Sequence, residues 1–244
     1  MPHFPSDIHT FVDLFSGGCN VAINTWADKI ICNDINSIIV ELFQYFQNNE
    51  LSKILNEIET VISEFELSKT NEDGFKELRN RYNNERTPID LYVLSCYSFN
   101  YQFRFNSNHE YNNPFGRNRS QFSESMRNNL IKFVTKLHTS DISFTTKDFV
   151  DFEIDDLNAG DFIYCDPPYL ITTGSYNDGN RGFKDWGIDE EQQLYDFLDK
   201  ANEKGIRFAF SNVLEHKGKT NNMLIEWSQK YKIIDINRDY SNSS

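Results

Sequence analysis

The stretch that decides the fold is FVDLFSGGCNVAINTWADKIICNDINSIIVELFQYF, residues 11–46. It opens with a short apolar run, residues 11–15, which ends in a Ser-Gly-Gly turn and is followed by helical spacing over residues 21–26. A second apolar run covers residues 29–32, and residues 35–46 place their apolar side chains on one helical face. The order strand, helix, strand, helix predicts an α/β fold with a parallel sheet.

The pattern changes to mainly helical between residues 51 and 137. Within this segment, residues 101–114 alternate between aromatic and polar side chains around a turn at 107–109, which predicts a β-hairpin with a polar face. We therefore expect an α/β domain of residues 1–50 and 138–244, interrupted by a helical insert of residues 51–137. The helices predicted in the insert are 51–65, 72–82, 88–99 and 123–137.

Predicted strands and helices alternate again after the insert, to the end of the chain. A polar loop is expected over residues 172–186. The predicted strands are 142–144, 161–165, 206–210 and 232–236, and the predicted helices are 189–204 and 220–231.

The charge of the chain is unevenly distributed. It has 24 Lys and Arg against 37 Asp and Glu, a net charge of −13, which excludes non-specific binding of nucleic acid over the whole surface. Residues 100–137 contain six basic and two acidic residues and carry +4, so the remainder carries −17. A nucleic-acid partner would therefore use this local patch, with Arg104, Arg117 and Arg119 on phosphates or a guanine edge. The alternative is an ordinary solvated hairpin.

Neither a membrane segment nor a secretion signal is visible. The longest apolar runs have four to six residues, far short of the roughly 20 that span a bilayer. The first residues have no basic region and no apolar core, so we expect a cytoplasmic location in a bacterial or phage-infected cell. The cysteines have no C-x-x-C spacing and predict small buried side chains rather than zinc ligands or disulfides; they are Cys19, Cys32, Cys96 and Cys165.

The sharpest motif is Asp-Pro-Pro-Tyr, residues 166–169, directly after an apolar strand. One interpretation is a rigid turn that ends the strand, because two prolines fix φ and remove two donors. The other is a site that methylates an amino group. The lone pair of an exocyclic amine is delocalised, so an enzyme must accept its N–H hydrogens, and Asp166 and the carbonyl of Pro167 are suitable preorganised acceptors. Tyr169 offers a ring on which a flipped base can stack.

A second motif joins the Ser16-Gly17-Gly18 turn to Asp34, which lies 17 residues after Gly17 and ends the next strand. A glycine turn after the first strand, with an acidic residue about 20 positions on, is typical of nucleotide-cofactor sites, in which the carboxylate binds ribose hydroxyls. The turn does not match G-x-G-x-x-G. The alternative is an ordinary strand-to-helix turn with a surface aspartate.

With these motifs, the chain resembles the Dam-type DNA adenine-N6 methyltransferases of the α (D12) class, especially phage-encoded members. The resemblance implies a Rossmann-like fold, S-adenosylmethionine as methyl donor, and duplex DNA with a flipped adenine as substrate. GATC is the commonest target of the family. The segments that carry the resemblance are 11–18, 33–35, Leu67-Ser-Lys-Thr70, Leu91-Tyr-Val-Leu94, Asn113-Pro-Phe-Gly-Arg117, 160–172 and Ser211-Asn-Val-Leu-Glu-His216.

The resemblance also implies roles for individual residues, with no metal and no obligate protein partner. Catalytic roles fall on Asp166, Pro167, Pro168 and Tyr169. Cofactor binding falls on Phe15, Ser16, Gly17, Gly18, Asp34, Asp148 and Asp166. DNA contacts fall on Arg104, Asn106, Pro114, Arg117, Asn118 and Arg119. Asn118 stands where relatives often have Tyr or Arg, which makes GATC a weaker expectation.

The two ends depart from the family pattern. The chain starts after the aromatic-x-Gly-x-Lys segment that helps hold the cofactor, and it stops before the usual last hairpin, so weaker cofactor binding is expected. Two alternatives to DNA methylation stay open. The acceptor could be RNA or a protein side-chain amide, or the chain could be a non-catalytic remnant that only binds DNA. The sequence does not separate roles in restriction-modification, phage protection or regulation.

Overall fold

The computed structural model describes residues 3–172 and 186–236. Its centre is a five-stranded sheet in the order β3-β2-β1-β4-β5, and every neighbouring pair is parallel. The strands are β1 (Thr10–Asp13), β2 (Lys29–Asn33), β3 (Ile142–Thr145), β4 (Phe162–Cys165) and β5 (Arg207–Phe210). The α/β fold with a parallel sheet is therefore confirmed, and the ends of each predicted strand in this sheet lie within two residues of their observed places.

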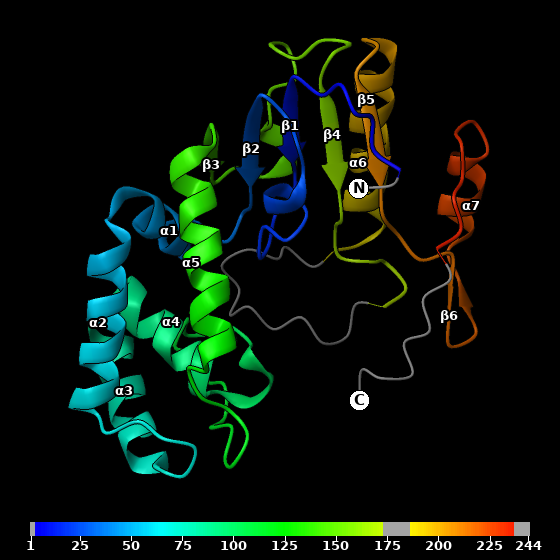
Figure 1. Ribbon diagram of the computed structural model, residues 1–244. Helices are drawn as coiled ribbons and strands as arrows, with labels where there is room; N and C mark the ends of the chain where they lie inside the picture. Colours follow the sequence, from blue (N-terminus) through cyan, green and yellow to red (C-terminus); the bar gives the residue numbers. More distant parts are fainter. Residues whose placement is uncertain (1–2, 173–185, 237–244) are drawn as a thin grey trace.

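Helices cover both faces of the sheet (Figure 1). Because successive side chains of a strand point to opposite faces, Phe11 and Val12 of β1 enter two different cores. The core around Val12 includes Leu194 and Leu198 of α6. The core around Phe11 extends into the helices of residues 51–137, which we call the helical part. The helices are α1 (Ser37–Asn48), α2 (Leu51–Glu64), α3 (Glu72–Glu85), α4 (Pro88–Tyr97), α5 (Glu124–Thr139), α6 (Ile188–Glu203) and α7 (Asn222–Ser228).

The helices of residues 51–137 gather beside the β3 edge of the sheet, at the lower left of Figure 1. Helix α4 packs against α1, α2 and α3, and nearly all of its side chains are buried. It begins with Thr87 as N-cap and Pro88 in the first turn. The buried carboxylate of Asp90 is paired through two hydrogen bonds, 2.8 and 2.6 Å, with Arg81 of α3. The helical part thus has its own interior and shares one core with the sheet.

Two predicted elements differ in the structure. The helix expected over residues 21–26 is only a short 3-10 turn, η1 (Ala22–Asn24), because Thr25 is already extended, and Trp26 is 83% exposed. The strand expected over 232–236 is absent from the described residues there, and Ile233, Ile234 and Ile236 are exposed. An apolar run alone does not make a strand when it finds no neighbouring strand.

The predicted β-hairpin of residues 101–114 is present in a short, irregular form. Its arms pair through the antiparallel bridge between Phe105 and Tyr111, which is flanked by hydrogen bonds from the Asn106 N–H to the Glu110 carbonyl at 2.9 Å and from the Asn112 N–H to the Arg104 carbonyl at 3.0 Å. The turn lies at residues 107–109, as predicted, whereas the positive φ values of Asn100 and Tyr101 keep the start of the predicted segment out of the pairing. The alternation arises because Phe105 is buried while its polar neighbours face outward. A second short hairpin, which the sequence analysis did not predict, forms at residues 215–220.

Three further expectations concern the cysteines, membrane-spanning helices and the polar loop. All four cysteines are free and buried, as predicted. Among the helices of the described residues, none is long and apolar enough to cross a membrane. Most of the polar loop predicted over 172–186 lies outside the described residues.

Candidate active site

A cavity of about 460 Å³ opens at the carboxyl ends of β1, β2 and β4. The strand order reverses between β1 and β4, because the chain proceeds from β1 to β2 and β3 on one side and from β4 to β5 on the other. Such a switch point is where open parallel sheets bind ligands. Every residue predicted for catalysis or cofactor binding lines this cavity: Phe15, Ser16, Gly17, Gly18, Asp34, Asp148, Asp166, Pro167, Pro168 and Tyr169.

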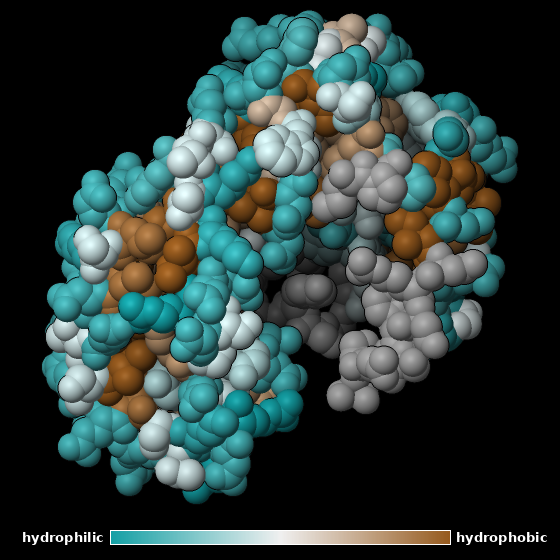
Figure 2. Space-filling view, in the orientation of Figure 1, coloured by the Kyte–Doolittle hydropathy of each residue, from teal (hydrophilic) through white to brown (hydrophobic). Residues whose placement is uncertain are grey.

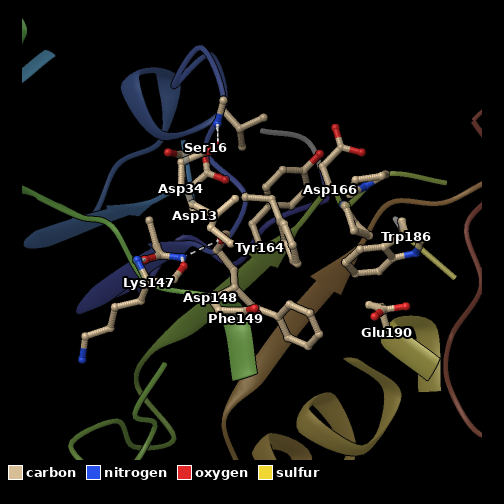
Figure 3. A pocket seen from close by; sticks show the side chains of 18 of the residues that line it. Asp13, Ser16, Asp34, Lys147, Asp148, Phe149, Tyr164, Asp166, Trp186 and Glu190 are labelled. Carbon is tan, nitrogen blue, oxygen red and sulfur yellow. Dashed lines mark hydrogen bonds between the residues drawn. The ribbon is translucent and has the colours of Figure 1, made fainter. Parts of the chain in front are cut away.

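The glycine turn after β1 and the carboxylate after β2 are joined directly. Asp34 is labelled in Figure 3, and its Oδ2 accepts from the Gly17 N–H at 2.7 Å. Its Oδ1 accepts from the Asn36 N–H at 2.8 Å. Gly17 has φ +45°, and a Cβ there would meet nothing within 4 Å, so backbone conformation rather than space requires glycine. The turn and Asp34 therefore form one preformed edge of the cavity.

Asn33 fixes the ends of three strands beneath this edge. Its buried side-chain amide donates to the carbonyl of Leu14 at 3.1 Å and to that of Lys147 at 3.0 Å. Its Oδ1 accepts from the Thr145 hydroxyl at 2.8 Å. These contacts tie the loops after β1, β2 and β3 together, which places Asp148 in the cavity wall with its Oδ1 accepting from the Val150 N–H.

Three aromatic rings form one side of the cavity. The ring centroid of Phe15 lies 5.6 Å from that of Phe149 and 5.7 Å from that of Trp186, and Phe149 and Trp186 are 5.6 Å apart. Only Phe15 of these three rings was expected from the sequence. The other two come from the turn after β3 and from the approach to α6, so their contribution arises from folding. A flat aromatic ligand fits such a wall.

The Asp-Pro-Pro-Tyr motif follows β4 and meets the end of β5. The Tyr169 hydroxyl donates to Asp166 Oδ1 at 2.6 Å and lies 3.2 Å from the Ser211 hydroxyl. Burial, followed by the hydrogen bond to Asp166, raises the pKa of Tyr169 well above its usual range, so this hydroxyl stays protonated and donates. Asp166 itself is exposed at the cavity, across from Asp34 in the view of Figure 3.

The comparisons with known proteins fit this geometry. The family description "D12 class N6 adenine-specific DNA methyltransferase" matches residues 1–242. The chain belongs to this family. The assignment confirms the resemblance seen in the sequence, and it agrees with the combination of a glycine turn, a following carboxylate and a proline motif in one cavity.

The chain spans well under half the length of the curated relatives that it matches at 55–56% identity. It is 55% identical over 244 residues to the Type II methyltransferase M.FokI of Planomicrobium okeanokoites and 56% identical over 246 residues to the modification methylase StsI of Streptococcus sanguinis. Each match covers 100% of this chain and 38% of the relative. The DNA N-6-adenine-methyltransferase of Escherichia phage P1 is 24% identical over 207 residues, covering 82% of this chain and 26% of that enzyme. Identity to the two modification enzymes is thus higher than to this phage-encoded one.

Asp13, the last residue of β1, is a cavity residue that sequence analysis left without a role. It is 2% exposed, its Oδ2 accepts from the Ala22 N–H at 3.2 Å, and its Oδ1 has no hydrogen-bond partner among the described residues. Burial, with the nearby charges of Asp166 and Asp34, raises the pKa of Asp13 to about 7. An acidic residue that ends an apolar strand was the available signal.

The raised pKa makes a prediction about stability. The pKa of Asp13 is near 4 in the unfolded chain and about 7 in the fold, so the folded protein holds this proton more tightly. The resulting contribution to the free energy of unfolding is complete below about pH 4 and is lost as pH rises through 7. Between pH 5 and pH 7 the free energy of unfolding should therefore fall by about 2 kcal/mol more in the parent chain than in the Asp13→Asn variant. Urea unfolding of both proteins at several pH values measures this difference, and an equal fall in the two would contradict the raised pKa.

The residues expected to contact DNA lie away from the cavity, in the loop between α4 and α5. Arg104 and Pro114 are exposed. The Asn106 side chain is used within the loop, where its Oδ1 accepts from the Glu110 N–H at 2.9 Å. Asn118 has φ 62° and donates its N–H to the carbonyl of Lys69 at 2.7 Å.

Several charges of the basic segment have partners inside the helical part. Arg117 forms an ion pair with Glu72, Arg127 forms one with Glu59, and Arg119 lies over the ring of Phe99 at 4.8 Å. The fixed positive potential of the loop is therefore smaller than the count of basic residues indicates, although exposed pairs of this kind exchange easily.

Proposed function

We propose that this chain transfers a methyl group from S-adenosylmethionine to the N6 amine of an adenine in duplex DNA. The observation that carries the proposal is the joining of Asp34, the glycine turn and the Asp-Pro-Pro-Tyr motif in one cavity at the switch point of the sheet. The D12 family assignment supports the same chemistry.

The cavity residues suit the proposed cofactor. Among the described residues that line it, five are acidic (Asp13, Asp34, Asp148, Asp166 and Glu190) and one, Lys147, is basic, so it favours a cationic ligand. Asp13 has a buried oxygen without a partner, which an ammonium group would satisfy. Asp34 is placed for ribose hydroxyls, and the rings of Phe15, Phe149 and Trp186 for an adenine, beside Asp148. When bound, S-adenosylmethionine supplies an electrophilic methyl carbon.

The catalytic residues act on the acceptor amine. The Asp166 carboxylate and the Pro167 carbonyl accept its two N–H hydrogens, which directs the nitrogen lone pair toward the methyl donor. Tyr169 holds Asp166 through its hydroxyl, so its ring is fixed as a stacking surface for a base removed from the duplex. As the bond between nitrogen and the methyl carbon formed, the sulfur–methyl bond of the donor would break and leave a neutral thioether, and the positively charged nitrogen would then lose one proton. Pro168 stiffens the turn that carries these groups.

The proposed duplex lies in the hollow between the helical part and the sheet (Figure 2). Residues 1–50 and 138–244 would form the catalytic unit, and residues 51–137 would read the target, with Arg104, Asn106, Pro114, Arg117, Asn118 and Arg119 facing DNA. GATC or a related site is the first target to test. A DNA substrate would place the protein in the cytoplasm of a bacterial or phage-infected cell, and no further protein partner is required by this scheme.

The experiment is methyl transfer by the purified chain from labelled S-adenosylmethionine to unmethylated plasmid DNA, with RNA and a protein extract as parallel acceptors. Duplexes carrying GATC or a scrambled site, and methyladenine sequencing of DNA from expressing cells, then define the target. Label in adenine of DNA is expected. Label only in RNA or protein would change the acceptor, and absence of calorimetric heat with millimolar S-adenosylmethionine would favour a non-catalytic remnant.

A further inference from the structure

A small hairpin that the proposed function has not used follows β5. Strands β6 (Glu215–His216) and β7 (Lys219–Thr220) pair antiparallel, Glu215 with Thr220 and His216 with Lys219. The two turn residues, Lys217 and Gly218, have φ values of 48° and 78°. Positive φ at both positions is the geometry of a tight two-residue hairpin turn, which projects its tip sharply away from the protein.

The hairpin lies close to the proposed reaction centre. Ser211 is within 3.2 Å of the Tyr169 hydroxyl, and the hairpin begins four residues later, so its base is at most about 14 Å from Ser211 along the chain. Figure 1 shows the hairpin and the helical part on opposite sides of the carboxyl end of the sheet. A duplex with a base in the cavity would therefore pass between them.

Both ends of the hairpin are anchored to a buried glutamate of α6. Glu191 is 0% exposed, and its Oε1 accepts from the side-chain amides of Asn212 at 3.1 Å and Asn221 at 3.2 Å. The Asn221 N–H also donates to the carbonyl of Leu214 at 2.9 Å, which closes the loop that contains the hairpin. Glu191 Oε2 accepts from the Trp186 indole in the cavity wall at 2.7 Å. The hairpin is thus held in a fixed place relative to the cavity.

The tip of the hairpin is basic. Lys217 and Lys219 are exposed, and neither takes part in an ion pair within the described ranges 3–172 and 186–236. This differs from Arg117 and Arg127, whose charges are paired with glutamates. One exposed acidic residue, Glu215, lies at the base. In a chain of net charge −13, two unpaired lysines beside the active site are suited to phosphate.

We propose that the β6–β7 hairpin contacts the phosphate backbone of duplex DNA through Lys217 and Lys219, on the side of the cavity opposite the helical part. The inference rests on the proposed function, because it requires DNA at this cavity. It adds a sequence-independent contact that would position the duplex, whereas target reading would remain with the helical part.

The test compares two double variants with the same loss of charge. Lys217→Asn with Lys219→Gln removes the hairpin charges, and asparagine tolerates the positive φ at position 217. The control, Lys29→Gln with Lys200→Gln, removes two exposed lysines, one at the start of β2 and one on α6. Binding of a fluorescent duplex is measured by anisotropy between about 50 and 200 mM salt, and S-adenosylmethionine binding by calorimetry.

The hairpin variant should bind DNA about tenfold more weakly near 0.1 M salt, and the slope of log affinity against log salt should fall by about 2. Its affinity for S-adenosylmethionine and its unfolding midpoint should match those of the control. Equal DNA affinities and slopes for the two variants would overturn the hairpin contact while leaving the proposed function intact. A parent chain that binds no DNA in the same assay would overturn both.

Discussion

Replacing Asp166 with Ala should lower the rate of methyl transfer at saturating S-adenosylmethionine and DNA by at least about a hundredfold. The carboxylate is the charged acceptor that the amine would meet at this cavity, and its Oδ1 is already oriented by the Tyr169 hydroxyl at 2.6 Å. Loss of this preorganised group leaves the amine lone pair delocalised and misdirected. Single-turnover measurement with labelled cofactor isolates the chemical step from product release.

Two further variants separate the role of the carboxylate from simple damage to the turn. Asp166→Asn keeps one acceptor oxygen and should retain more activity than the alanine variant. Tyr169→Phe keeps the ring but removes the hydroxyl that contacts Asp166 and Ser211, so its rate should fall by roughly tenfold while base stacking persists. An alanine variant within about threefold of the parent rate would show that Asp166 has no part in the reaction.

The parallel sheet could be predicted because its strands are short apolar runs separated by helical periodicity, and each buried run finds a parallel neighbour. The predicted strand over 232–236 shows the limit. Its isoleucines resemble those of a buried strand, yet Ile233 and Ile236 are exposed, since pairing depends on segments distant in the sequence. The predicted hairpin at 101–114 forms but pairs over a shorter stretch than expected, because Asn100 and Tyr101 have positive φ values.

The candidate site was predictable where its chemistry is carried by a short motif. The glycine turn, Asp34 and the residues of 166–169 were each found from spacing, and they line the same cavity. Trp186 and Phe149 were not found, because nothing beside them in the sequence marks them as partners of Phe15. Glu191 lies in an acidic first turn that resembles an ordinary solvated helix end. Its importance appears only when the folded chain surrounds it.

Glu191 is a single buried acceptor for four donors. Besides Asn212, Asn221 and the Trp186 indole, the Tyr195 hydroxyl donates to its Oε1 at 2.7 Å. Replacing Glu191 with Ala should therefore destabilise the fold by roughly 4 kcal/mol or more, because the buried donors lose their partner and a cavity remains. Such a loss is a large fraction of the roughly 5 to 15 kcal/mol that stabilises a typical domain, so urea unfolding should show a much lower midpoint for this variant than for the parent chain.

The isosteric change Glu191→Gln should leave the protein folded, so the contribution of the Trp186 hydrogen bond to its stability can be measured. An amide can still accept from Asn212 and Asn221 through its oxygen, but its NH₂ group then faces the Trp186 N–H, which places donor against donor. Urea unfolding should show a loss of roughly 2 to 3 kcal/mol. In a Trp186→Phe background the opposing N–H is absent, so the same change should cost at least about 1 kcal/mol less. Equal costs in the two backgrounds would show that Glu191 does not stabilise the cavity wall through Trp186, and that its contribution lies with the two asparagines and the Tyr195 hydroxyl.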